Sequence, residues 1–230
     1  MERKLGNYSQ VELQRISGVT PQNLTELNID FDKTCDKQSP PEVCCLLSHL
    51  KAIYIAYMAG HQFAIISEDD FFVLEMPNFL EIAKRAPPDW NIIQLFVSGI
   101  GLTNYEQFYN HPTPFVRYQY EYWGTVIYMI NRDGMHTLLQ KYMPMHRDDL
   151  KWEQVKIQLK NNIGKFCAAD YALYDPVNTY TYTRPHFNIE KNNENQMNRK
   201  SDHDAIHAKI SDAVAGYFSM YKTWHSSIEG

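Results

Sequence analysis

The sequence lacks an excess of basic residues, an apolar leader and any long apolar run. Its formal net charge is −5, with 22 Lys and Arg against 27 Asp and Glu. Because non-specific binding to nucleic acid depends on basic surface, we expect no nucleic-acid partner. No N-terminal stretch resembles a signal peptide and no run is long enough to cross a bilayer, so we expect no membrane span.

Cysteine is also scarce. The four cysteines are Cys35, Cys44, Cys45 and Cys167. They form no CxxC pair, and we recognise no Cys/His metal spacing around them. Cys44 and Cys45 fall in an apolar run of helical character, so we expect buried free thiols. This usage favours the cytoplasm or another reducing compartment, and the localisation stays open.

The length and composition suit one globular domain. With 230 residues, 44% of them hydrophobic, the chain can bury a substantial core. No internal repeat is visible. A helix that leads into a strand through Gly60 and His61 is typical of α/β proteins. We therefore expect a single α/β domain at 1–230, with an irregular N-terminal part at 1–40, a core at 41–187 and a polar segment and helix at 188–230.

Periodicity, proline, glycine and asparagine predict the individual elements. Pro40 and Pro41 suit the first turn of a helix, and Asn131 suits an N-cap. Helices are expected at 40–59, 79–85, 131–142, 148–160 and 205–224, with a helical turn at 167–174. Strands are expected at 15–19, 62–67, 90–97, 123–130 and, at a sheet edge, 177–183. Loops are expected at 21–40 and 98–115, and the length of the second indicates a functional role.

An apolar run that includes Ile65 and Ile66 ends abruptly at three carboxylates, Glu68, Asp69 and Asp70. Along a strand, Glu68 and Asp70 would face one side and Asp69 the other. Hard cations such as Mg²⁺ and Mn²⁺ prefer oxygen ligands and often share them with substrate phosphates. Ligands commonly bind at the carboxyl ends of strands in open α/β sheets. The triplet therefore predicts a metal and nucleotide site, with a solvated acidic turn as the alternative.

Four stretches in matching order, over roughly residues 40–190, resemble family 25 glycosyltransferases. This family includes lipopolysaccharide and collagen hydroxylysine galactosyltransferases. The similar stretches are the Ser48-His49-Leu50 helix, the strand ending in Glu68-Asp69-Asp70, the segment from Gly124-Thr125 to Gly134, and Ala169-Asp170-Tyr171 with the strand leading to Pro185. Each motif alone is weak, whereas their common order is fairly specific.

The resemblance implies a GT-A-like, Rossmann-like nucleotide-sugar fold. It also implies an inverting, metal-dependent transferase that moves a hexose, commonly galactose, from a UDP-sugar to a hydroxyl of a glycan or hydroxylysine. The cofactor would be Mn²⁺ or Mg²⁺, held by Asp70 and Asp69, with His186 as a late contact. Donor-binding residues would be Ser48, His49, Glu68, Asp69 and Arg184. The catalytic base would be Asp170, or in second place Glu121, and the acceptor site would include Tyr122, Trp123, Gly124 and Thr125.

One departure from the family concerns the N-terminus. Family members begin with a strand that contacts the nucleotide, and Met1 to Leu5 resemble the helix that follows that strand. A catalytically inactive, transferase-like binding domain is therefore the alternative function. A phosphohydrolase that uses the same acids is a third hypothesis, to which the cluster Asp202-His203-Asp204 could contribute. Further basic residues for a diphosphate would be Lys191, Arg199 and Lys200, and an oligomer is compatible with the sequence.

Overall fold

The computed structural model describes residues 12–31, 40–99, 105–144, 151–159, 168–189 and 208–219. Its centre is a five-stranded mixed sheet with the strand order β2-β6-β4-β8-β5. The strands are β2 (Phe63–Ser67), β4 (Ile92–Gln94), β5 (Phe115–Arg117), β6 (Ile127–Asn131) and β8 (Thr179–Tyr182). Strands β4 and β8 are parallel, and the other neighbours are antiparallel. The protein is thus an α/β protein with a mixed sheet.

Two small sheets extend this centre. Strand β1 (Ile29–Phe31) pairs in parallel with β7 (Ile157–Leu159). Strand β3 (Phe71–Val73) follows the acidic triplet and pairs antiparallel with β9 (Phe187–Ile189). The second pair brings the chain after β8 back beside the segment that follows β2.

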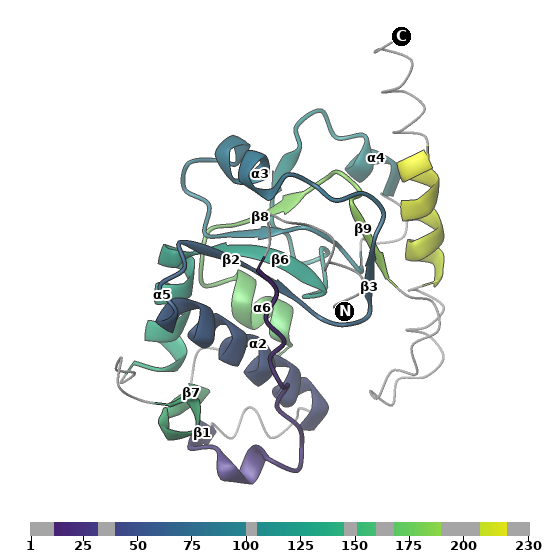
Figure 1. Ribbon diagram of the computed structural model, residues 1–230. Helices are drawn as coiled ribbons and strands as arrows, with labels where there is room; N and C mark the ends of the chain where they lie inside the picture. The colour runs from purple at the N-terminus through teal and green to yellow at the C-terminus, as the bar shows by residue number, and fades with distance from the viewer. Residues whose placement is uncertain are drawn as a thin grey trace.

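Helices cover both faces of the central sheet (Figure 1). The helical segments are η1 (Leu24–Glu26), α2 (Pro40–Met58), α3 (Phe79–Arg85), α4 (Tyr105–Tyr109), α5 (Arg132–Tyr142), η3 (Trp152–Gln154) and α6 (Ala169–Tyr174). Residues 208–219 are helical as well. Helices α2, α5 and α6 lie together on one face, and α3 lies on the other (Figure 1). None of the described helices is both long and apolar enough to cross a membrane.

The alternation of side chains along β4 and β6 builds a core on each face. Ile92 and Ile130 belong to a first cluster with the buried residues of α2, α5 and α6. Ile93 and Met129 belong to a second cluster with buried residues of α3, β3 and β9. All four side chains are fully buried. A strand that is covered on both faces needs apolar residues at every position, which explains why these runs show no polar alternation.

Three predicted helices form where the sequence places them. Helix α2 begins at Pro40, helix α3 spans Phe79–Arg85 as expected, and helix α5 begins after Asn131. The Asn131 side chain accepts a hydrogen bond from the Gly134 amide at 2.8 Å, which confirms the predicted N-cap. Helix α6 confirms the helical turn predicted at 167–174 over its described residues. The helix at 208–219 confirms the described part of the helix predicted at 205–224.

Other predicted elements are wrong. The strand expected at an edge, β8, lies between β4 and β5. Residues 15–19 form no strand, because this segment lies against α2, where the Val19 amide donates to Ser48 Oγ at 2.8 Å. Within the helix expected at 148–160, the described part contains η3 and strand β7. The loops expected at 21–40 and 98–115 contain η1, β1 and α4.

Some expectations fall on positions that the structure does not describe. These positions are Cys35, Cys167, Lys191, Arg199, Lys200 and the cluster Asp202-His203-Asp204. Cys44 and Cys45 are free thiols, as expected. Cys44 is buried and Cys45 is half-buried, because the two successive positions lie on different sides of α2.

Candidate functional site

Polar side chains from distant parts of the chain meet at one edge of the central sheet. Strands β2, β4 and β8 run in the same direction, so their carboxyl ends lie at the same edge. Glu68 follows β2 at this edge, and the segment 124–126 enters antiparallel strand β6 there. This is the edge where open α/β sheets bind ligands.

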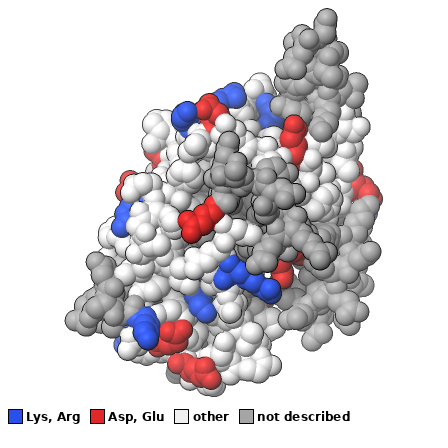
Figure 2. All heavy atoms as spheres, viewed as in Figure 1, with Lys and Arg blue, Asp and Glu red and all other residues white. Residues whose placement is uncertain are grey.

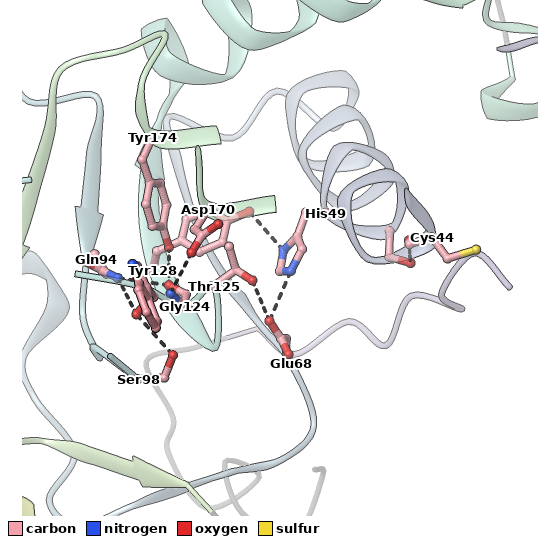
Figure 3. A network of polar contacts seen from close by, with 12 residues as sticks. Cys44, His49, Glu68, Gln94, Ser98, Gly124, Thr125, Tyr128, Asp170 and Tyr174 are labelled. Atoms are coloured by element: carbon pink, nitrogen blue, oxygen red, sulfur yellow. Dashed lines mark hydrogen bonds and ion pairs between the residues drawn. The ribbon is translucent and has the colours of Figure 1, made fainter. Parts of the chain in front are cut away.

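Glu68 links helix α2 to the segment before β6 (Figure 3). Its Oε1 lies 3.4 Å from His49 Nε2 and accepts a hydrogen bond of 2.7 Å from Thr125 Oγ1. The other ring nitrogen of His49, Nδ1, lies 3.3 Å from the hydroxyl of Tyr128 on β6. His49 is therefore held from both ring nitrogens, between a carboxylate and a phenol.

The environment of His49 favours its protonated form in the metal-free chain. Burial lowers the pKa of this imidazole, but hydrogen bonds to the side chains of Cys45 and Glu68 outweigh burial and raise the pKa to about 10. The side chain is only 5% exposed, so its charge is balanced locally by the Glu68 carboxylate.

Cys45 completes a group of three side chains around this carboxylate. One ligand atom from each of Cys45, His49 and Glu68 lies within 4.8 Å of the other two. Cys45 and His49 are four residues apart on α2 and so project from the same face of the helix. These three side chains could hold a metal ion. From the sequence we recognise no Cys/His metal spacing around the cysteines, whereas the structure places Cys45 and His49, which are four residues apart, in one possible ligand group with Glu68.

Asp170 at the first turn of α6 approaches the same edge. Its Oδ2 accepts a hydrogen bond from the Gly124 amide at 3.2 Å, and its Oδ1 accepts one from the Tyr171 amide at 3.0 Å. Burial raises the pKa of this carboxyl, the two amides lower it, and the negative charge of Glu68 raises it further. The net increase makes Asp170 a stronger base than an ordinary exposed carboxylate.

The backbone of the 122–124 segment is fixed from inside the sheet. Gln94, which is completely buried on β4, donates through Nε2 to the carbonyls of Tyr122, Trp123 and Gly124 at 3.0, 3.3 and 3.0 Å. Tyr174 of α6 also donates to the Gly124 carbonyl, at 3.0 Å. Gly124 has a positive φ of 106°. A Cβ at this position would collide with Ser98 Oγ, so both conformation and space require glycine.

An aromatic surface lies beside Asp170. We use this term for Tyr120, Trp123 and Tyr171. Tyr120 is 61% exposed and Trp123 is 48% exposed. The rings of Tyr120 and Tyr171 lie 5.4 Å apart, and the Tyr120 hydroxyl donates to Asp175 at 3.1 Å. Exposed aromatic rings with a fixed backbone can stack on the apolar face of a sugar or another ring.

Two other predicted residues of this segment differ in their environment. Tyr122 is half-buried and packs against Phe108, with ring centroids 5.2 Å apart. Glu121 is exposed. Burial raises the pKa of Tyr171, and the nearby negative charges, Asp170 first and Glu121 least, raise it further. Tyr122 therefore supports the segment from within, whereas Glu121 faces solvent near the aromatic surface.

The remaining acids of the triplet lie between β2 and β3. Asp69 is exposed, and Asp70 is half-buried with one carboxylate oxygen, Oδ1, fully buried. Among the described residues, neither acid belongs to a group of three mutually close metal-ligating side chains. A cation at this position would complete its coordination with oxygens of a ligand or water.

The structure does not bring Ser48, Arg184 and His186 to this edge. Ser48 Oγ accepts from the Val19 amide and donates to the Cys44 carbonyl at 2.7 Å. The guanidinium of Arg184 donates twice to the His111 carbonyl, at 3.2 Å each. These polar groups hold backbone segments instead of facing Glu68.

His186 lies at the far end of the β3–β9 ladder from the acids. Its carbonyl accepts from the Leu74 amide, and its Nδ1 lies 3.2 Å from the Glu75 carbonyl. All three residues of β3 separate Leu74 from Asp70. The structure therefore separates His186 from Asp69 and Asp70, which it was expected to join at the metal.

Sequence reasoning missed several residues of the site. These are Cys45, Gln94, Tyr120, Tyr128 and Tyr174. The four-residue spacing of Cys45 and His49 on a predicted helix could have identified the first of them. The others depend on which strands are neighbours, and this information is not contained in local spacing.

Comparisons with known proteins give no identification. No protein-family model matches the chain, and neither a curated protein nor a solved structure matches it. The function is therefore argued from the site alone.

Proposed function

We propose that this protein is a metal-dependent glycosyltransferase with a GT-A-like fold. One observation carries the proposal: four segments far apart in the sequence meet at the carboxyl edge of the sheet. His49 contacts Glu68, Glu68 accepts from Thr125, and Gly124 donates to Asp170 (Figure 3). A nucleotide-sugar transferase needs donor, metal and base residues side by side. In support of the proposal, Asp69 and Asp70 directly follow Glu68 in the sequence, and Asp170 is linked to the same edge through Gly124.

In this proposal Asp70, with Asp69, holds Mn²⁺ or Mg²⁺ together with the diphosphate of a UDP-sugar. The half-buried Asp70 and exposed Asp69 fit a hard cation that takes one or two carboxylates and completes its shell with phosphate oxygens. When bound, such a cation offsets the charge of the departing diphosphate. His186 lies apart and is not included.

A metal is also the simplest source of positive charge for a diphosphate here. The guanidinium of Arg184 donates two hydrogen bonds to the His111 carbonyl. On the face shown in Figure 2, acidic and basic side chains are interspersed among uncharged ones, and neither sign dominates the described residues. A donor with two negatively charged phosphates would therefore depend on the cation for most of its charge compensation.

Asp170 is the base that we propose for the acceptor hydroxyl. Its two amide hydrogen bonds fix the carboxylate in place, and its raised pKa favours proton uptake from a hydroxyl. Glu121 remains the second choice, because it is exposed, whereas two backbone amides orient Asp170. The acceptor is proposed to lie on the aromatic surface, chiefly on Trp123, with its hydroxyl near Asp170.

A catalytically inactive binding domain is the second candidate. Within the described part of the chain, β2 is an end strand of the central sheet and pairs only with β6. In the family that the sequence resembles, a further strand contacts the nucleotide, and among the described residues no such strand pairs with β2. A binding domain would retain the aromatic surface and lose the need for a donor.

A ligand-dependent thermal shift tests the proposal. We expect UDP and Mn²⁺ together to raise the unfolding temperature more than either alone, because each completes the other's binding site. At a free ligand concentration of 100 times Kd, binding stabilises the fold by about 2.7 kcal/mol. A screen of UDP-sugars for hydrolysis would then identify the donor. Absence of any joint effect at millimolar ligand would contradict the transferase and leave the binding domain.

A further inference from the structure

We propose that Cys45, His49 and Glu68 form a binding site for a zinc-class divalent cation, separate from the hard-cation position at Asp70. The site offers one sulfur, one nitrogen and one oxygen ligand and leaves a fourth position open. This inference does not depend on the transferase proposal, because it is based only on the chemistry and placement of three side chains.

The distances suit a tetrahedral ion. The three ligand atoms lie within 4.8 Å of one another, and His49 Nε2 lies 3.4 Å from Glu68 Oε1. Two ligands bound at about 2.1 Å in a tetrahedron are about 3.4 Å apart, so this pair already has the spacing of adjacent zinc ligands. A sulfur at about 2.3 Å and a nitrogen at about 2.1 Å from one zinc ion are about 3.6 Å apart, which lies within the 4.8 Å that bounds the distances of the Cys45 sulfur.

Neighbouring groups hold the ligands in position, as in metal sites generally. Tyr128 contacts Nδ1 of His49 at 3.3 Å, which leaves Nε2 directed at Glu68. The Thr125 hydroxyl donates to the Glu68 carboxylate at 2.7 Å. Such contacts orient ligands and commonly change metal affinity about 10- to 100-fold.

Charge and accessibility favour the same conclusion. A thiolate and a carboxylate together neutralise a divalent cation, and the imidazole adds a neutral donor. Glu68 is 32% exposed and Cys45 is half-buried, so an ion can enter from solvent. The thiolate selects zinc-class ions over Mg²⁺ and Mn²⁺, which prefer oxygen. Three protein ligands with one open position are typical of zinc that binds water or a substrate.

Cobalt(II) provides a spectroscopic probe of this site. The whole chain, stripped of metal by a chelator, is titrated with Co²⁺, and Zn²⁺ is then added as a competitor. We expect one Co²⁺ per chain, a thiolate-to-cobalt charge-transfer band, the strong visible bands of tetrahedral cobalt, and loss of all bands on Zn²⁺ addition. Saturation without a charge-transfer band, or no stoichiometric binding, would overturn the proposal whatever the variants show.

The two adjacent cysteines give a matched pair of variants. Cys45→Ala should weaken Co²⁺ binding at least tenfold and remove the charge-transfer band, whereas Cys44→Ala should keep both. Figure 3 shows the Cys44 sulfur directed away from His49 and Glu68. Both variants retain Cys35 and Cys167. A band that survives Cys45→Ala would overturn the assignment.

Variants of the other ligands separate binding from folding. Glu68→Gln should weaken Co²⁺ binding at least tenfold, and Thr125→Val should weaken it about tenfold without removing the charge-transfer band. Thermal unfolding of each metal-free variant shows whether it is folded. If Cys45→Ala does not fold, Cys45→Ser replaces it, because serine has nearly the same size and lacks the thiolate. Unchanged affinity in folded Glu68→Gln would contradict the site.

Discussion

At the scale of single residues, the carboxylates of the site differ in exposure and therefore in the roles that they can take. Asp69 is exposed, Asp70 has a buried oxygen, and Glu68 is engaged by His49 and Thr125. Asp170 is oriented by two amides. Neighbouring acids in one sequence triplet thus differ in their environments, and substitutions at each should have separable effects.

Asp70→Ala should reduce metal-dependent turnover of a UDP-sugar at least about a hundredfold, because the variant lacks the carboxylate proposed to hold the cation. The fold should survive, and this is checked by circular dichroism. Glu153→Gln is the control, since Glu153 is an exposed acid on η3. Full activity in Asp70→Ala would remove this residue from the metal site.

Asp170→Asn should retain UDP binding and lose transfer by about 10²- to 10⁴-fold, the usual contribution of a general base. Binding is measured by thermal shift and transfer by product mass. Glu121→Gln is the comparison, for which we expect a smaller effect. The opposite order of effects would make Glu121 the base.

Asp170 should also change how stability depends on pH. Its pKa is raised above the ordinary value of 3.8, mainly by burial, so the folded chain binds this proton more tightly than the unfolded chain. Folding stability therefore falls as the pH rises through the interval between the two pKa values. The unfolding free energy of Asp170→Asn minus that of wild type should therefore increase as the pH rises through this interval. Urea unfolding at a series of pH values measures this difference. A difference that is constant with pH would contradict the raised pKa.

At the scale of elements, the glycine before β6 is required by its surroundings as well as by its backbone angle. Gly60 at the end of α2 has a similar positive φ of 80°, but a Cβ there would meet nothing within 4 Å. At Gly124 a Cβ would collide with Ser98. A substitution at Gly60 therefore measures the cost of backbone strain alone, whereas one at Gly124 adds the cost of steric overlap.

Gly60→Ala should cost about 1–2 kcal/mol of unfolding free energy, which is the cost of a left-handed conformation. Gly124→Ala should cost more and should shift the segment that bears Trp123. Urea unfolding and tryptophan fluorescence measure the two effects. Adding Ser98→Gly should recover part of the loss in Gly124→Ala, and equal costs at the two glycines would contradict the steric argument.

The elements that could be predicted from sequence are those with local signals. Helices α3 and α5 have an asparagine N-cap and a clear apolar spacing, and both form where expected. Strands β3, β7 and β9 are three residues long, too short for periodicity to identify. Strand β7 depends on β1, which lies far away in the sequence, so the local pattern predicted a helix there.

The same distinction applies to the site. Glu68 and His49 were predicted from their motifs, and the structure places them in contact. Arg184 was predicted to bind the donor and His186 to contact the metal, but their side chains lie against the backbone carbonyls of His111 and Glu75. A motif specifies residue type and order, whereas the direction of a side chain also depends on competing partners nearby.

At the scale of the whole molecule, the central sheet separates two clusters that should unfold together. Ile92 and Ile93 are adjacent on β4, are both completely buried, and face opposite clusters. Because β4 contributes to each cluster, loss of either one should expose the strand to water. The single-domain prediction therefore has a direct test.

Ile92→Ala and Ile93→Ala should each lower the unfolding free energy by about 2–5 kcal/mol, as is usual for buried isoleucine. Both should shift one and the same cooperative transition, measured by calorimetry and by denaturant unfolding. Leu80→Ala is the control, since Leu80 is 53% exposed and should change stability by less than about 0.5 kcal/mol. Two separate transitions would show that the clusters belong to different domains.

Gln94 has a consequence for how this protein could change over evolution. Its buried amide holds three consecutive carbonyls, while Thr181 donates to its Oε1 at 2.9 Å from the neighbouring strand. The outward side chains of the 120–123 segment play no part in these bonds. Substitutions at Tyr120 or Trp123 can therefore alter the surface without moving the backbone, so new binding preferences could arise through single exchanges that the fold tolerates.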